Sequence, residues 1–114
     1  MGEGPTPCES PLVRPGLATD ELVRLEGLFQ ALADRYRLSI VDMLVQADGQ
    51  PICVCEFQDA LLLKQPTVSY HLRRLVDAGV IEREQRGRYS YYALHAGILD
   101  RIDDLVRPRE AVAA

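Results

Sequence analysis

Three cysteines, Cys8, Cys53 and Cys55, are the residues of this chain with the most distinctive chemistry. Cys53 and Cys55 flank Val54 where a short amphipathic helix is predicted to begin. Residues two apart in a regular helix point in nearly opposite directions, but a residue before a helix and one in its first turn can bring their sulfurs together. A helix N-terminus also favours the thiolate, which is the form that binds metals. We therefore predict a ligand site at Cys53 and Cys55 with Val54 buried between them; the alternative is that both are small packing residues.

The segment 64–92 has the charge expected of a nucleic-acid-binding surface. It carries six basic and three acidic residues, although the whole chain has a net charge of −4. A basic segment on an acidic body is compatible with DNA binding, because the distribution of charge matters more than its sum. A short helix, a turn and a second helix opening with Gln-Pro-Thr is the helix-turn-helix arrangement, whose second helix enters the major groove of double-stranded DNA. The predicted DNA contacts on that helix are Gln65, Thr67, Ser69, Tyr70, Arg73 and Arg74.

A β-hairpin is predicted over 81–94, where the apolar period changes to two. Arg86 and Arg88 stand beside Gly87 at its tip, and a basic tip on a thin hairpin suits a phosphate backbone or a minor groove. His71 lies beside the buried stripe of the preceding helix, so we interpret it as a packed or hydrogen-bonded residue rather than a base reader. The alternative for the whole segment is a solvated basic face, or one that contacts an acidic protein partner.

Helical periodicity predicts the elements that position these residues. Helices are expected over 19–33, from a cap at Asp34 to Asp48-Gly49, from 54 to about 63, from 65 to 78, and over 98–106. The predicted buried residues are, helix by helix, Leu22, Leu25, Phe29 and Leu32; Leu38, Val41, Leu44 and Val45; Val54, Phe57 and Leu61; Val68, Leu72, Leu75 and Val76; and Ile98, Ile102, Leu105 and Val106. The predicted fold is mainly α with a β-hairpin, a winged helix-turn-helix domain over 17–107, between a flexible arm at 1–16 and a frayed tail at 108–114.

Length and composition limit the class of protein. A chain of 114 residues allows one domain with a modest core, so dimerisation through a spare apolar helix is expected to stabilise it. No apolar run approaches a membrane span, and the first residues lack the pattern of a signal peptide, so we expect a cytoplasmic protein without a membrane partner. The sequence offers no Cys-x-x-Cys motif, phosphate loop or nucleophile–His–acid set, which argues against an enzyme.

Two stretches, LADRYRLSIVDML and QPTVSYHLRRLVDAGVIEREQRGRYSYYAL, resemble the ArsR/SmtB family of metal-sensing bacterial repressors. The resemblance covers about residues 20–106. It implies a homodimer built on the first and last helices, an imperfectly palindromic operator and release of that operator by an inducer. The segment PICVCEF also resembles the Cys-Val-Cys segment of the arsenic- and cadmium-sensing members.

The chain departs from both of those patterns. Arsenic sensors of the best-known type carry a third cysteine one helical turn on, where this chain has Gln58, and cadmium/lead sensors carry two arm cysteines, where this chain has only Cys8. The resemblance therefore implies Cys8 as the third thiolate, and the residues from Cys8 to Leu17 can extend up to ~30 Å, enough to cross a dimer interface. Three thiolates favour As(III) or Sb(III), because zinc requires four ligands. Cd(II) or Pb(II), with Glu9 or water as fourth ligand, stays open.

Two further interpretations concern the remaining candidate ligands. His95, Asp100 and Asp103 lack the histidine pair and spacing of the zinc site in other members of the family, so we interpret these carboxylates as a solvated face. The cysteines could also form a redox switch on a DNA-binding protein, because exposed thiols of low pKa oxidise readily.

Overall fold

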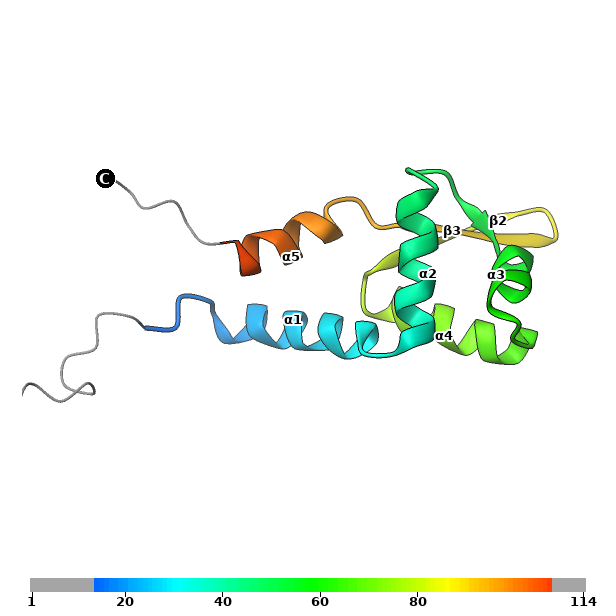
Figure 1. Cartoon of the computed structure of the whole chain (residues 1–114). Helices are drawn as coiled ribbons and strands as arrows, with labels where there is room; N and C mark the ends of the chain where they lie inside the picture. The colour runs from blue at the N-terminus through cyan, green and yellow to red at the C-terminus, as the bar shows by residue number, and fades with distance from the viewer. Residues whose placement is uncertain (1–13, 108–114) are drawn as a thin grey trace, which may run out of the picture.

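The computed structural model describes residues 14–107; residues 1–13, which include Cys8 and most of the predicted arm, and the predicted tail at 108–114 lie outside the described residues. Figure 1 shows the elements in chain order, and the prediction of a mainly α fold with a β-hairpin is confirmed. Their bounds are α1 (Thr19–Leu32), α2 (Arg35–Gln46), β1 (Ile52–Cys53), α3 (Val54–Leu61), α4 (Gln65–Asp77), β2 (Ile81–Arg86), β3 (Tyr89–Leu94) and α5 (Ile98–Val106).

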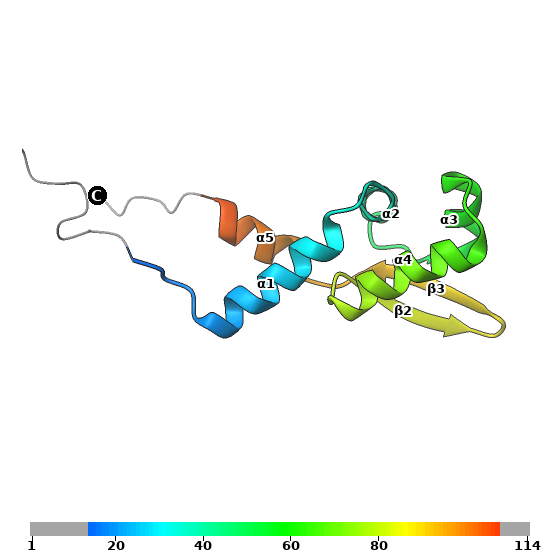
Figure 2. The same cartoon turned by 90° about the horizontal axis from the view of Figure 1, so that it is seen from below.

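The elements form two groups along the molecule. Helices α2, α3 and α4 gather with the three-stranded sheet, whereas α1 and α5 lie side by side and extend away from them (Figures 1 and 2). No helix within residues 14–107 is long and apolar enough to cross a membrane. The predicted recognition helix, α4, and the hairpin therefore lie at one end of the molecule. The two helices that are predicted to form a dimer interface, α1 and α5, lie at the other end.

The core lies where α2, α3 and α4 meet the hairpin. Ile40, Phe57 and Leu72, one from each of these helices, are fully buried. On the sheet, Tyr92 is buried and meets the Phe57 ring edge to face, with ring centroids 6.4 Å apart. Because an aromatic residue buries a large apolar area, this pair fixes α3 against the sheet.

The predicted apolar faces of α1 and α2 are partly wrong. Leu22, Phe29, Leu38 and Val45 are exposed, and the buried positions include Leu28, Ala31 and Ile40 instead. Both helices carry apolar residues around much of their circumference, so periodicity alone does not decide which face packs on the domain. On α5, likewise, Ile98 is buried but Leu105 and Val106 are exposed.

The two-residue strand β1 is absent from the sequence prediction. It pairs antiparallel with β3, with Ile52 opposite Tyr92 and Cys53 opposite Tyr91, so the order of the sheet is β1-β3-β2. A strand of two residues is too short to show a period. Its pairing buries Cys53 and leaves Val54 only half-buried, which corrects the prediction that Val54 takes the buried position.

The helix ends follow local sequence signals, with one exception. The Asp34 carboxylate accepts hydrogen bonds from the backbone amides of Tyr36 (2.8 Å) and Arg37 (3.1 Å), which makes it the predicted cap of α2. Gly79, with φ +79°, follows the last residues of α4 as predicted. The exception is Leu62, which adopts a left-handed φ of +57° and ends α3 two residues before its predicted limit.

Candidate functional site

The two neighbouring cysteines converge at the start of α3. Cys53 is the last residue of β1 and the N-cap of α3, with extended backbone, and Cys55 is the second residue of the helix. This change of backbone conformation brings the two Sγ atoms to 3.1 Å, and the Cys55 thiol donates to the Cys53 sulfur. Cys53 is buried and Cys55 is exposed. The pair can thus present two sulfurs to one ion from the surface.

The expected lowering of the thiol pKa is wrong for Cys55. Its hydrogen bond to Cys53 holds the proton and raises the pKa, and burial and the neighbouring sulfur act in the same direction. Two thiolates this close would repel each other unless a cation lay between them. Within residues 14–107, no group of three His, Cys, Asp or Glu side chains could hold a metal. The predicted third ligand, Cys8, lies outside the described residues.

The residues of α4 that are predicted to contact DNA lie on its surface, on two sides of the helix. Gln65, Ser69 and Arg73 line a groove that α4 forms with the hairpin. On the opposite flank, Arg74 Nη1 donates to the Tyr70 hydroxyl at 3.4 Å. Thr67 is exposed in the first turn of the helix. The structure thus leaves all six polar side chains at or near the surface, while Val68, Leu72 and Leu75 hold the helix to the core.

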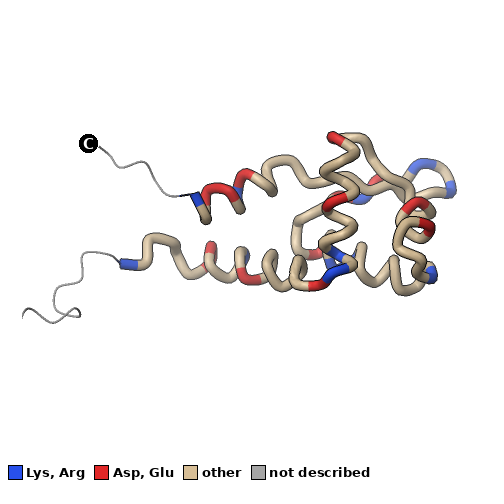
Figure 3. The backbone as a smooth tube through the Cα atoms, in the orientation of Figure 1, with Lys and Arg blue, Asp and Glu red and all other residues tan. Residues whose placement is uncertain are grey.

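The hairpin carries its arginines differently from the prediction. Gly87, with φ +61°, and Arg88 form the turn, but Arg86 is the last residue of β2. Arg86 Nε donates to the Glu84 carboxylate at 2.9 Å, and the guanidinium lies over the Tyr91 ring, 4.9 Å from its centroid. The hydrogen bond from Arg86 lowers the pKa of Glu84. Figure 3 shows basic residues at the hairpin turn.

Arg83 is a basic residue of the hairpin that the sequence reasoning missed. It lines the groove opposite Arg73, because residues 81 and 83 share the face of β2 that meets α4. The alternation of side chains along a strand could have revealed this position in the sequence. Ile81 is buried, so the side chain two positions later, that of Arg83, points to the same side of the strand.

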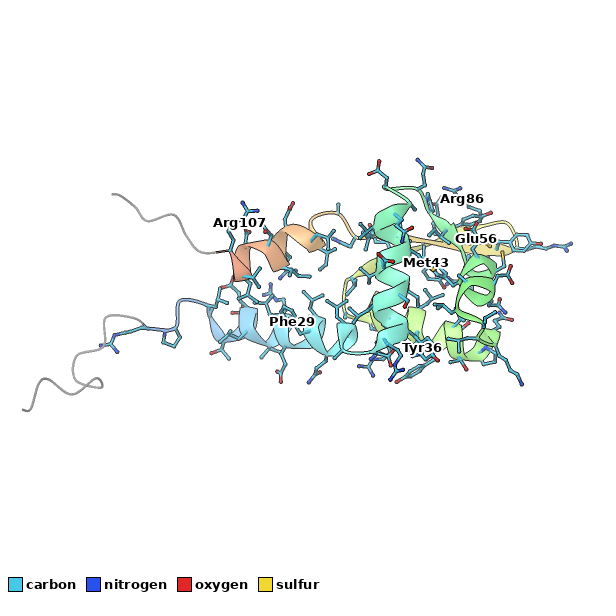
Figure 4. The ribbon with its side chains drawn as sticks, in the orientation of Figure 1. Phe29, Tyr36, Met43, Glu56, Arg86 and Arg107 are labelled. Carbon is cyan, nitrogen blue, oxygen red and sulfur yellow. The ribbon has the colours of Figure 1, made fainter. Side chains whose placement is uncertain are left out.

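His71 lies in a buried polar junction between α4 and the start of α2. Its Nδ1 is 3.1 Å from Arg37 Nη1 and 3.9 Å from the Asp34 carboxylate. The ring of Tyr36, which is labelled in Figure 4, lies 5.7 Å from the His71 ring between centroids. Arg37 Nε also donates to the carbonyl of Ala31 at the end of α1. The interpretation of His71 as a packed, hydrogen-bonded residue is confirmed. The junction ties the end of α1 to the middle of the helix predicted to read DNA.

An apolar surface is exposed on α1 and α5. Phe29 is 40% exposed and Leu105 is 43% exposed, values that are high for side chains of this size and polarity in a small domain. The exposed apolar residues of the two helices are Leu22, Val23, Phe29, Leu99, Leu105 and Val106. Clustered apolar side chains on neighbouring helices are typical of a protein–protein interface.

A short helix, a left-handed turn, a second helix with a polar outer face and a basic hairpin together define a winged helix-turn-helix domain. This is the fold of DNA-binding transcriptional regulators rather than of an enzyme.

Comparisons with known proteins identify the family. Residues 34–83 match the bacterial regulatory protein, arsR family. The chain is 33% identical over 93 residues to an arsenic resistance transcriptional regulator of Pseudomonas putida, covering 82% of this chain and 71% of that protein. It is 42% identical over 76 residues to the arsenical resistance operon repressor of Bacillus subtilis, covering 66% and 70% of the two chains. The chain therefore belongs to the arsR family of bacterial regulatory proteins, as the resemblance indicated.

A solved structure agrees with this fold. The homodimeric winged helix-turn-helix DNA-binding domain of a possible ArsR-family regulator from Mycobacterium bovis, determined by NMR, superposes with a TM-score of 0.65 at 26% identity. The match covers 82% of this chain and 86% of that one.

Proposed function

We propose that this chain is a homodimeric repressor that binds double-stranded operator DNA and releases it when As(III) or Sb(III) binds Cys53, Cys55 and Cys8. The observation that carries the proposal is the 3.1 Å separation of the Cys53 and Cys55 sulfurs. Two thiolates bound at about 2.3 Å to one atom lie about 3.3 Å apart at a right angle and about 3.8 Å apart at a tetrahedral angle. The two sulfurs are therefore close enough to bind one atom, and the count of three thiolates favours a pyramidal centre. Relatives named as arsenical resistance repressors support the same inducer.

The proposed DNA-binding unit is a dimer. The exposed apolar residues of α1 and α5, including Phe29 and Leu105, would become buried between two copies. A twofold dimer presents two α4 helices to two half-sites of a palindromic operator, which a monomer cannot do. Because the DNA of a bacterial cell lies in its cytoplasm, the proposal includes a cytoplasmic location.

The position of the cysteine pair supports a route from inducer to DNA. Cys53 belongs to β1, which pairs with β3 of the hairpin, and Cys55 belongs to the first turn of α3, which leads through Leu62 to α4. Binding one ion to both sulfurs breaks the Cys55–Cys53 hydrogen bond, and a third ligand from Cys8 would pull on the backbone where these elements join. If α4 or the hairpin moved relative to the same element of the partner subunit, the two α4 helices would no longer match the spacing of the two half-sites. Coupling of this kind requires only ~1–3 kcal/mol.

Serine variants of the pair test the inducer site. Cys53→Ser and Cys55→Ser should each bind a fluorescein-labelled operator, as measured by anisotropy, but should no longer release it with arsenite. Glu56→Gln, in the same turn of α3, is the matched control and should respond like the wild type. If both serine variants release DNA normally, the thiols are packing residues and the inducer binds elsewhere.

The same assay separates the alternative inducers. Release by Cd(II) or Pb(II) but not by arsenite would assign the site to a divalent metal, with Glu9 or water as a further ligand. Release by peroxide, with the mass loss of two hydrogens expected for a Cys53–Cys55 disulfide, would assign it to a thiol redox switch.

The proposed third ligand, Cys8 of the partner subunit, is tested with a mixed dimer. One subunit carries Cys8→Ser and the other carries Cys53→Ser with Cys55→Ser. Ligation across the interface predicts one intact site in the mixed dimer and none in either mutant homodimer, read from the absorbance of the arsenic–thiolate complex. Ligation within one chain predicts no site in the mixed dimer. If Cys8 plays no part, the Cys8→Ser homodimer binds arsenic like the wild type.

A further inference from the structure

A polar groove of about 410 Å³ separates α4 from the hairpin. Gln65, Ser69 and Arg73 of α4 form one wall, and Arg83 and Ser90 of the hairpin form the other. The groove thus has a guanidinium on each side, with hydroxyl groups between them. Within the described residues, no carboxylate lies within ion-pairing distance of either Arg73 or Arg83.

Arg83 is held in place before any ligand binds. Its Nε and Nη2 donate to the Ser90 hydroxyl at 3.1 and 3.0 Å, and Nη2 also donates to the Gln85 amide oxygen at 2.8 Å. The Ser90 hydroxyl in turn donates to Gln85 at 2.9 Å. Nη1 has no such partner within residues 14–107. A guanidinium fixed in this way loses little further freedom when it binds an anion.

Arg86, three residues after Arg83 on β2, lacks these properties. Arg86 is ion-paired with Glu84 and lies over the Tyr91 ring. Its charge is therefore already compensated in the free protein, whereas the charge of Arg83 is available. This contrast makes Arg86 a matched control on the same strand.

We propose that this groove binds one phosphodiester of the bound DNA between Arg73 and Arg83, an inference that rests on the proposed DNA-binding function. If α4 lies in a major groove and the hairpin turn reaches the adjacent minor groove, the sugar–phosphate backbone that separates the two grooves passes between α4 and the hairpin. That is where Arg73 and Arg83 face each other. Nη1 of Arg83, the nitrogen without a partner, can donate to one phosphate oxygen. The Arg73 guanidinium can donate two parallel hydrogen bonds to the same phosphate.

The test is the salt dependence of DNA binding by Arg83→Gln. Each neutralised phosphate contributes about 0.9 to the slope of log affinity against log salt. Arg83→Gln should lower the slope by up to about 1 for each half-site, or up to about 2 per dimer, because Arg73 still contacts the same phosphate, and it should weaken operator and scrambled duplex by similar factors. Arg86→Gln should change the slope less, and Arg101→Gln, on α5, should not change it. Circular dichroism and thermal midpoints identify a variant that has unfolded, and Arg83→Lys, which keeps the charge, should recover most of the slope.

A duplex with a single methylphosphonate in each half-site, scanned along the backbone, provides the second measurement. At one position, neutralising the phosphate should weaken wild-type binding more than it weakens binding by Arg83→Gln, in which only Arg73 still contacts that phosphate. An unchanged slope for Arg83→Gln, with no such position, would overturn the groove proposal while leaving operator binding intact. Failure of the wild type to bind any operator would instead overturn the proposed function. Calorimetric binding of inorganic phosphate without DNA, abolished in Arg83→Gln while the DNA slope is unchanged, would reassign the groove to a free anion and overturn the proposal as well.

Discussion

Replacing His71 with leucine should expose the energetic role of the junction between α2 and α4. Arg37 Nη1 lies 3.1 Å from His71 Nδ1. Since a guanidinium only donates, Nδ1 accepts, and His71 is neutral with its proton on Nε2. Leucine fills similar space but leaves a buried, charged donor without its partner. Loss of a hydrogen bond to a charged group costs about 1.5–3 kcal/mol, so the free energy of unfolding should fall by that amount near neutral pH.

The same substitution should remove a pH dependence. Burial lowers the pKa of His71 from its ordinary value of 6.5 and Arg37 lowers it further, while Asp34 opposes them. Below pH 6.5 the unfolded chain therefore takes up a proton that the folded chain still excludes. The contribution of His71 to stability is complete above that pH and is lost as the pH falls toward the lower pKa of the folded state. Burial raises the pKa of Asp34, but the backbone hydrogen bonds from Arg37 and Tyr36 and the charge of Arg37 outweigh it, so the pKa lies below its ordinary value of 3.8. Asp34 therefore does not titrate in this window.

Urea unfolding at about pH 7.5 and about pH 5.5 measures both effects, at one protein concentration because a dimer is expected. The wild type should lose more stability on acidification than His71→Leu. His95→Gln, which changes the only other histidine, an exposed one, should keep the wild-type response. Arg37→Met combined with His71→Leu should recover part of the loss, since both partners are then apolar. An identical acid response in wild type and His71→Leu would refute the reasoning.

Four further changes test other parts of the molecule. Leu105→Glu should give folded monomers by analytical ultracentrifugation and abolish operator binding, and a wild type that is monomeric at micromolar concentration would contradict the dimer. Arg74→Ala should weaken operator binding about tenfold in the anisotropy assay while the dimer stays intact. Glu84→Gln should free Arg86 and tighten binding to any duplex by a few-fold, because an exposed ion pair contributes at most about 1 kcal/mol; unchanged binding would show that Arg86 stays clear of DNA. Gly79→Ala should lower the free energy of unfolding, measured with urea, by about 1–2 kcal/mol because the φ of residue 79 is +79°. No atom lies within 4 Å of the added methyl group, so the backbone conformation alone causes the loss. An unchanged stability would show that the turn relaxes.

Features determined by neighbouring residues could be predicted from the sequence. Asp34 caps α2, Gly79 follows α4, and Gly87 turns the hairpin, because each conformation depends on one residue and its immediate neighbours. The convergence of Cys53 and Cys55 is of the same kind. It follows from a change of backbone conformation between an N-cap and the first turn of a helix, which the local pattern indicates.

Features determined by distant contacts could not be predicted. Strand β1 exists only because β3 offers Tyr91 and Tyr92 as partners some forty residues later. The choice of Ile40 rather than Leu38 as a core residue depends on where α4 packs against α2. The availability of Arg83, and the neutralisation of Arg86 by Glu84, likewise depend on which side chains the folded hairpin brings together.

We expect the distribution of charge to favour one orientation of the proposed dimer toward DNA. The whole chain has a net charge of −4, yet the segment 64–92 is positive, and Figure 3 shows acidic residues along α1 and α5. We expect those helices to repel a polyanion and α4 and the hairpin to attract it. The acidic helices should therefore weaken DNA binding in every orientation except the one in which α4 and the hairpin face the DNA. Because salt screens the repulsion as well as the attraction, discrimination between orientations should be greatest at low ionic strength, where a uniformly basic protein would instead bind DNA without preference.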